Sequence, residues 1–305
     1  MPDTFRSGPG YRDNVLPAGF LALADTWISR TTDDRGIAWF RSALDEVSRA
    51  STDRTLGVAI GLAPRRLGKA GLALGADDLA RATALRNGLD PGGWSVDQLA
   101  RIALMVASYR DDAGFAERLD QFCATAEINE LIALCLGFAV YPVTAPIEPR
   151  AREAIRSGMK PVFEALAHRN PYPAEVLTED HWNQMIVKAI FTGSSLWPIQ
   201  GLDRRGNPRL ARMMVALAQE RWAADRPISP EIWRCIVPYA DREGMAALIR
   251  AWEHGVENDR LAIALALEST PKMSAGLPFG AQLDQARAVI AENNIDWRVL
   301  AAAQT

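Results

Sequence analysis

The sequence predicts an all-α protein, built either as an irregular α-solenoid of HEAT-like helix pairs or as a multi-helix bundle. Apolar residues recur at the helical spacing of three and four positions along almost the whole chain. Signals that start and stop helices lie between these runs, and paired spacing is clearest between 207 and 269. Residues 140–143 are the one strand-like fragment, and Pro142 argues against a strand there.

Each expected helix carries an apolar stripe that would face a neighbouring helix. In chain order the stripes are Phe20, Leu23, Ala24 and Trp27; Trp39, Phe40, Leu44 and Val47; Leu99, Ile102, Ala103 and Val106; Leu131, Leu134, Cys135 and Phe138; Ile155, Met159, Val162, Phe163 and Leu166; Trp182, Met185, Ile186 and Ala189; Leu210, Met213, Met214 and Leu217; and Met245, Leu248, Ile249 and Trp252. The fifth of these would run as one stripe along 151–168.

Capping residues predict where several helices begin and end. Asn207 followed by Pro208 is typical of an N-cap and a first helical position. The run 229–231 (SPE) repeats that pattern and adds an acid in the first turn, where the helix dipole favours it. Asp241 is expected to cap the next helix, and Gly255 to end it in a left-handed conformation.

The chain is expected to form a single helical domain over residues 1–305. At this length a folded chain hides roughly 75% of its unfolded surface, so a large core is possible. A soft boundary is predicted at 142–149, where three prolines interrupt two long helical stretches.

Charge and hydropathy exclude several classes of protein. The 34 basic and 37 acidic residues leave a net charge of −3, which argues against a nucleic-acid coat or a polybasic membrane binder. The longest uncharged stretch, 131–147, is shorter than the roughly 20 residues of a membrane span and contains prolines. It predicts a buried helix followed by a loop. The first fourteen residues are polar and lack a secretory signal, so a cytoplasmic location without membrane insertion is expected.

No motif indicates a metal, a cofactor or a catalytic centre. Cys123, Cys135 and Cys235 are scattered and form no CxxC pair, so buried free thiols are expected. The three histidines show no ligand-like spacing, and neither GxGxxG nor GxxxxGK[ST] occurs. We therefore predict no metal site, no cofactor and no assigned catalytic residue.

The densest polar group lies between 181 and 207. On a helix His181, Gln184 and Lys188 would share one face, and the loop 201–207 (GLDRRGN) would end at the start of the next helix. Two guanidinium groups beside a helix N-terminus can hold a phosphate or a carboxylate. The candidate ligand or partner site is therefore Asn183, Gln184, Lys188, Asp203, Arg204, Arg205 and Asn207.

Both this cluster and a second one also have a purely structural interpretation. In the first, Asp203 and an Arg would hold the loop in place while Asn207 caps the helix. The second cluster is Arg65, Arg66 and Lys69, which could contact an anion. It could equally be the cationic end of a helix that stops at Gly68.

A set of short runs carries a family resemblance. They are NPYPAE at 170–175, WNQM at 182–185, GLD at 201–203 with NP at 207–208, LARM at 210–213, ERWA at 220–223 and SPEIWR at 229–234, supported by PRRLGK at 64–69 and DQLAR at 97–101. Together they resemble the EboA family of bacterial proteins. The resemblance covers most of residues 55–270 and is most specific in 170–235.

The resemblance implies a soluble helical protein from an operon that also encodes a membrane prenyltransferase-like protein and several enzyme-like proteins. It implies a role in metabolite traffic, including export of secondary-metabolite precursors toward the periplasm. No catalytic residue transfers with it. The expected partners are thus a small anionic metabolite or operon-encoded proteins.

Three functions remain open from the sequence. The first is a non-catalytic binding or scaffold protein for metabolite traffic that uses the 183–207 surface. The second is an enzyme acting on a phosphorylated or isoprenoid-type metabolite, with Lys188, Asp203 and Arg205 in a pocket. The third is a helical-repeat nucleic-acid binder, since Arg supplies nearly all of the positive charge; the acidic balance argues against it.

Overall fold

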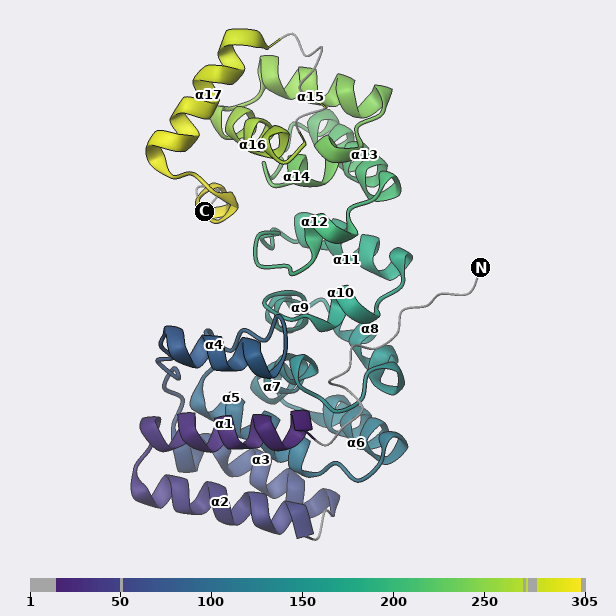
Figure 1. The fold of residues 1–305 in the computed structure, drawn as a ribbon. Coiled ribbons are helices and arrows are strands. Elements are labelled where there is room, and N and C mark those ends of the chain that lie inside the picture. The colour runs from purple at the N-terminus through teal and green to yellow at the C-terminus, as the bar shows by residue number, and fades with distance from the viewer. Residues whose placement is uncertain (1–14, 50–51, 271–272, 274–278, 303–305) are drawn as a thin grey trace. The chain divides into compact units, whose positions relative to one another are not determined.

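The computed structural model describes residues 15–49, 52–270, 273 and 279–302 (Figure 1). The polar first fourteen residues, on which the expected location partly depended, lie outside this range. The chain divides into two compact units, an N-terminal unit, Met1–Leu177, and a C-terminal unit, Thr178–Thr305. The prolines of 142–149 lie within the N-terminal unit. Whether the chain behaves as a single domain stays a prediction.

Helices make up both units. The N-terminal unit contains α1 (Val15–Thr31), α2 (Asp34–Arg49), α3 (Asp53–Leu67), α4 (Ala76–Leu85), α5 (Val96–Ala107), α6 (Asp112–Thr125), α7 (Ile128–Leu136), the 3-10 turns η1 (Gly137–Ala139) and η2 (Ala145–Ile147), α8 (Glu148–Arg156), α9 (Lys160–Ala167) and α10 (Tyr172–Val176). The C-terminal unit contains α11 (Glu179–Phe191), α12 (Leu202–Arg205), α13 (Pro208–Ala223), α14 (Ile232–Ile236), η3 (Val237–Tyr239), α15 (Arg242–His254), α16 (Glu257–Glu268), α17 (Gly280–Asn293) and α18 (Trp297–Ala302).

The all-α prediction is confirmed. Within the described residues no strand forms, and the β-type pairing is an isolated bridge between Gly71 and Ser95. The uncharged stretch 131–147 forms the end of α7, η1, a loop and η2, as predicted. The choice between an α-solenoid and a bundle stays a prediction.

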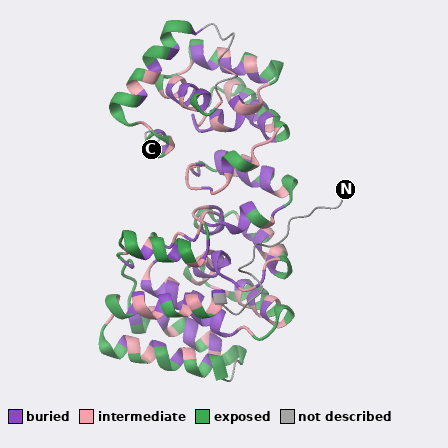
Figure 2. Cartoon of the chain, in the orientation of Figure 1, coloured by how far each residue is buried: buried purple, intermediate pink, exposed green. Residues whose placement is uncertain are grey.

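Helix α5 forms the centre of the N-terminal unit, where it packs against α1, α2, α3 and α7 (Figure 1). All of its residues except Gln98 are buried, including the charged Asp97 and Arg101. The outer helix α2 instead alternates buried and exposed residues along its length (Figure 2). The burial of α5 follows from its sequence, because an apolar helix needs neighbours on every side.

Each unit buries a tryptophan whose indole N–H binds an aspartate at the third position of another helix. Trp27 donates to Asp78 over 3.0 Å, and Trp233 donates to Asp259 over 3.1 Å. Each aspartate also accepts the N–H of the residue just before its own helix. A hydrogen bond from Arg30 lowers the pKa of Asp78 to about 2, whereas burial raises the pKa of Asp259. The same hydrogen-bond arrangement thus accompanies pKa shifts of opposite direction in the two units.

The predicted helix at 151–168 and the predicted stop at Gly255 are each wrong in one detail. The stripe along 151–168 is divided between α8 and α9, and Met159 between them is 43% exposed. Pro161 lacks the N–H that would continue α8 into α9, and Gly158 weakens the helix further. Gly255 follows α15 as predicted but with φ −77° and ψ 175°, which is not left-handed. Its role is spatial, since a Cβ there would lie 2.3 Å from the carbonyl oxygen of Ala251.

Candidate functional site

The candidate site is built on α11. The hydroxyl oxygen of Thr178 caps this helix by accepting the N–H of His181 over 3.4 Å. The predicted stripe of Trp182, Met185, Ile186 and Ala189 is fully buried, and α11 packs on α13. The polar residues of α11 are thereby held at defined positions on the remaining faces.

Asn183 and Asn207 form a reciprocal amide pair. The amide nitrogen of Asn207 donates to the side-chain oxygen of Asn183 over 2.9 Å, and that of Asn183 donates back over 3.2 Å. Asn207 also accepts the N–H of Leu210 over 2.9 Å and donates to the carbonyl oxygen of Arg205 over 3.1 Å. The predicted N-cap at Asn207 is confirmed, and the pair ties the start of α13 to α11.

The segment 201–207, which we name the α12 corner, is held at its other end by an ion pair. Gly201 precedes α12 in the left-handed conformation, with φ 79°. Asp203 accepts two hydrogen bonds of 2.7 Å each from Arg234 of α14. The Arg234 guanidinium also lies 5.5 Å from the ring centroid of Trp297. The arginine that holds the loop is therefore remote in sequence, unlike the neighbouring Arg204 and Arg205.

Arg204 and Arg205 lie side by side in the chain with different surroundings. Arg204 is exposed, whereas Arg205 is half-buried with its guanidinium 4.8 Å from the ring centroid of Trp182. Burial and then the charge of Arg204 lower the pKa of Arg205, and Glu179 opposes them. A bound anion would relieve this repulsion between the two cations.

The other predicted residues on α11 lie on different faces of the helix from Asn183. Gln184 is exposed. Lys188 is half-buried, and this burial lowers its pKa. Five positions separate Lys188 from Asn183, which places them well apart around the helix axis. The structure thus joins Asn183, Asn207 and Arg205, while Gln184 and Lys188 belong to other faces of α11.

The second cationic cluster lies in the N-terminal unit. Arg65 and Arg66 are exposed in the last turn of α3, and Lys69 is exposed just beyond it. Gly68 ends the helix with φ 81° and donates its N–H to the carbonyl oxygen of Pro64, so the predicted stop is confirmed. The dipole at the C-terminus of α3 favours cations in this place, which is the arrangement that the structural interpretation predicts.

Glu231 has a structural role that the sequence pattern did not predict. The predicted helix start at 229–231, with Pro230 in first position and Glu231 in the first turn, is wrong, because α14 begins at Ile232. Glu231 precedes the helix and is 1% exposed. Its carboxylate accepts the backbone N–H groups of Leu196 and Trp197 over 2.9 and 2.6 Å. Glu231 therefore holds the loop that leads into the α12 corner. No local signal could have revealed this, because its partners lie 34 and 35 positions away.

The structure also bears on the predictions about thiols and the membrane. Cys123, Cys135 and Cys235 are free and buried, as predicted, and burial raises the pKa of each thiol. No cluster of three or more His, Cys, Asp or Glu side chains suited to a metal occurs in the part of the chain that is described. The helices in that part include none with the length and apolarity needed to cross a bilayer.

Replacing Asn207 with Ala is expected to lower the free energy of unfolding by about 2 kcal/mol. The change removes a helix cap, worth about 1 kcal/mol, and leaves the buried amide of Asn183 short of partners. Chemical denaturation followed by circular dichroism measures the effect. Asn207→Ser retains a cap but cannot form the amide pair, so it should lose less stability than Asn207→Ala. Equal stability of wild type and Asn207→Ala would contradict the assignment.

Comparison with known proteins adds a family to this geometry. A family model described as "Metabolite traffic protein EboA" matches residues 20–237. The match includes the α12 corner, Glu231 and Arg234, and it ends before α15. No curated protein and no solved structure matches the chain.

Proposed function

The chain belongs to the EboA family of metabolite traffic proteins, and from this we propose that it is a non-catalytic binding protein in metabolite traffic. It would act in the cytoplasm together with operon-encoded partners, which include a membrane prenyltransferase-like protein. Its task would be to hold or pass on precursors of secondary metabolites on their way to export.

We place the contact surface at the α12 corner, and one observation carries that choice. Arg204 and Arg205 present two adjacent positive charges on a short helix that is anchored at both ends, by Asp203–Arg234 and by Asn183–Asn207. Because the anchors hold the corner in place, an anion would bind with little further ordering of the chain. Guanidinium groups suit carboxylates and phosphates, which they bind through paired hydrogen bonds.

The occupant that this chemistry favours is a small metabolite with a carboxylate or phosphate group. An acidic segment of an operon-encoded protein offers the same groups and would bind by the same contacts. The two sources differ in mass and can be told apart directly in material purified from the native host.

An anionic metabolite or a partner protein should co-purify with the wild type. With the double variant Arg204→Gln, Arg205→Gln we expect its amount to fall by about tenfold or more. Tagged versions purified from the native host are compared by mass spectrometry of both small molecules and proteins. Arg212→Gln, an exposed arginine on α13, serves as the matched control and should behave as wild type.

The result that removes the proposal is unchanged co-purification in the double variant. If the double variant then shows only a lower midpoint of thermal unfolding, the α12 corner is a structural element. A loss of binding in the Arg212→Gln control as well would show a general effect of surface charge, which also contradicts a specific site at the corner.

A further inference from the structure

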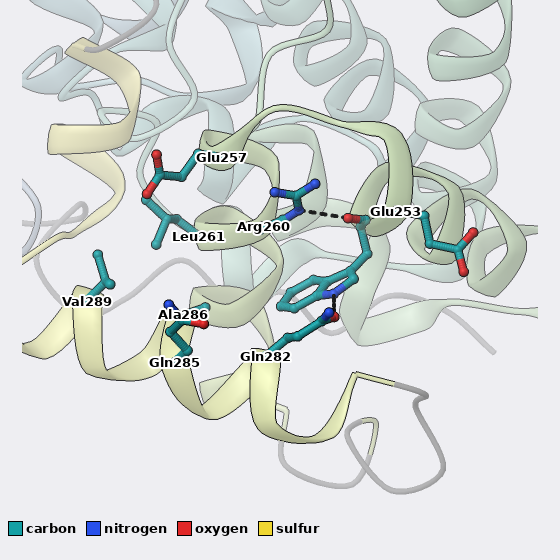
Figure 3. A pocket seen from close by; sticks show the side chains of 9 residues that line it. Glu253, Glu257, Arg260, Leu261, Gln282, Gln285, Ala286 and Val289 are labelled. Carbon is teal, nitrogen blue, oxygen red and sulfur yellow. Dashed lines mark hydrogen bonds between the residues drawn. The ribbon is translucent and has the colours of Figure 1, made fainter.

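A cavity of about 560 Å³ lies in the C-terminal unit between the end of α15 and the helices α16 and α17 (Figure 3). This volume is within the range of small-molecule sites, about 300–1,000 Å³. The lining residues begin at Trp252, outside the 20–237 segment that matches the family. A role for this cavity is therefore independent of the function proposed for the α12 corner.

The wall of the cavity is apolar and rigid on one side. Trp252, Leu261 and Ala286 are 4%, 7% and 8% exposed, so only small parts of their side chains reach the cavity. The Trp252 ring stacks on Phe279 with centroids 4.3 Å apart and planes 16° apart. Its orientation is therefore set by packing, and the wall can receive an apolar group without rearrangement.

Two side chains bring hydrogen-bond donors to the cavity with defined orientations. Gln282 accepts the indole N–H of Trp252 over 3.1 Å, which turns its amide NH₂ away from the ring. The Nε of Arg260 donates to the carbonyl oxygen of Trp252 over 2.8 Å, which fixes the plane of the guanidinium. In Figure 3 dashed lines mark these hydrogen bonds of Gln282 and Arg260, and the two terminal nitrogens of Arg260 take no part in the one drawn.

Carboxylates complete the lining. Glu253 at the end of α15 and Glu257 at the start of α16 are both exposed and line the cavity. In Figure 3 Glu257 extends above Leu261 and away from the guanidinium of Arg260. The two carboxylates would repel a simple anion, and Arg260 would repel a simple cation. A ligand that carries both charges meets a complementary group at each end.

We infer that this cavity binds a zwitterionic small molecule with an apolar body, between an amino acid and a dipeptide in size. Its carboxylate lies against Arg260 and Gln282, where forked donors suit it. Its ammonium group lies against Glu257. Its apolar body covers Leu261 and Val289, which removes apolar surface from water.

Calorimetric titration of the full chain with L-leucyl-L-leucine tests this inference. Three matched probes separate the contributions: the N-acetylated dipeptide lacks the positive charge, the C-terminal amide lacks the negative charge, and glycylglycine lacks the apolar body. We expect saturable binding of L-leucyl-L-leucine and at least about tenfold weaker binding of each of the other three. The absence of saturable binding of L-leucyl-L-leucine, or equal affinity for all four probes, would overturn the inference.

Variants of the protein locate the binding. Arg260→Gln and Glu257→Gln should each weaken L-leucyl-L-leucine binding by about tenfold or more. Arg287→Gln and Glu292→Gln make the same charge changes on α17 outside the lining and should bind as wild type. Thermal unfolding of every variant verifies that it is folded. If Arg260→Gln and Arg287→Gln both bind the dipeptide as the wild type does, the dipeptide occupies another place.

Discussion

Replacing Arg101 with Met is expected to lower the free energy of unfolding by about 3–5 kcal/mol, the usual effect of removing one partner of a buried ion pair. Arg101 is 2% exposed in the middle of α5 and lies 3.3 Å from the carboxylate of Asp97, which is itself buried. Its Nε donates to the carbonyl oxygen of Ile60 over 3.2 Å, so it also links α5 to α3. Without Arg101 the charge of Asp97 remains buried with less compensation.

The double variant Asp97→Asn, Arg101→Met provides the control. The asparagine removes the buried charge and can still accept the hydroxyl of Ser95, which donates to Asp97 over 2.6 Å. We therefore expect the loss of stability in the double variant to be smaller than the sum of the losses in the two single variants, by about 1 kcal/mol or more. Urea denaturation of the four proteins measures this coupling. Additive losses would show that the two residues do not act as a pair.

Replacing Glu231 with Ala should lower the free energy of unfolding by about 3 kcal/mol at neutral pH. The change leaves the backbone N–H groups of Leu196 and Trp197 without their acceptor, each at a cost of about 1–3 kcal/mol. Hydrogen exchange resolved by residue provides a local measurement, since these two amides should exchange faster than in the wild type. Unaltered exchange at both amides would refute the role of Glu231 as the anchor of that loop.

The same residue makes the stability of the protein depend on pH. Burial raises the pKa of Glu231, and the hydrogen bonds from Leu196 and Trp197 only partly oppose it. The folded state therefore holds the proton more tightly than the unfolded state, whose pKa is about 4.3. The stability that this provides is fully present below about pH 4 and is lost as the pH rises through the raised pKa of the folded state.

Glu231→Gln, which cannot titrate, is the matched comparison for that effect. We expect the stability of the wild type relative to Glu231→Gln to fall as the pH rises from about 4 toward 7. Denaturation curves at several pH values give the difference directly. A constant difference across this range would show that the carboxyl titrates as it does in the unfolded chain.

Local patterns in the sequence predicted a large part of the helical framework. The spacing of apolar residues identified the buried stripe of α11, and the residue types at Asn207, Asp241 and Gly68 identified two helix starts and one stop. These features depend on residues within four positions of one another, and the physics that favours them acts over one helical turn. Gly255 shows where this reasoning fails, because close packing selects glycine as effectively as a left-handed backbone does.

The candidate site was predicted in part for the same reason. The position of Arg204, Arg205 and the Asn207 cap could be read from consecutive residues. The partners that hold them could not: Arg234 binds Asp203 from 31 positions away, and Asn183 binds Asn207 from 24. Such pairs form because segments distant in the sequence pack together. The sequence contains many other charged and amide side chains, and nothing local to Asp203 or Asn207 distinguishes the true partner from them.

The sequence by itself determined that this protein is all-α, where a few of its helices start and stop, and which family it resembles, because helix formation and capping are short-range effects. Only the tertiary structure decided what its polar groups do. Asp78 and Asp259 occupy the same position in their helices and accept a tryptophan N–H in the same way. Their pKa values nevertheless shift in opposite directions, because Arg30 is packed against one and not the other. Electrostatic energies depend on which charges folding brings within a few ångströms, and that is a property of the packed helices.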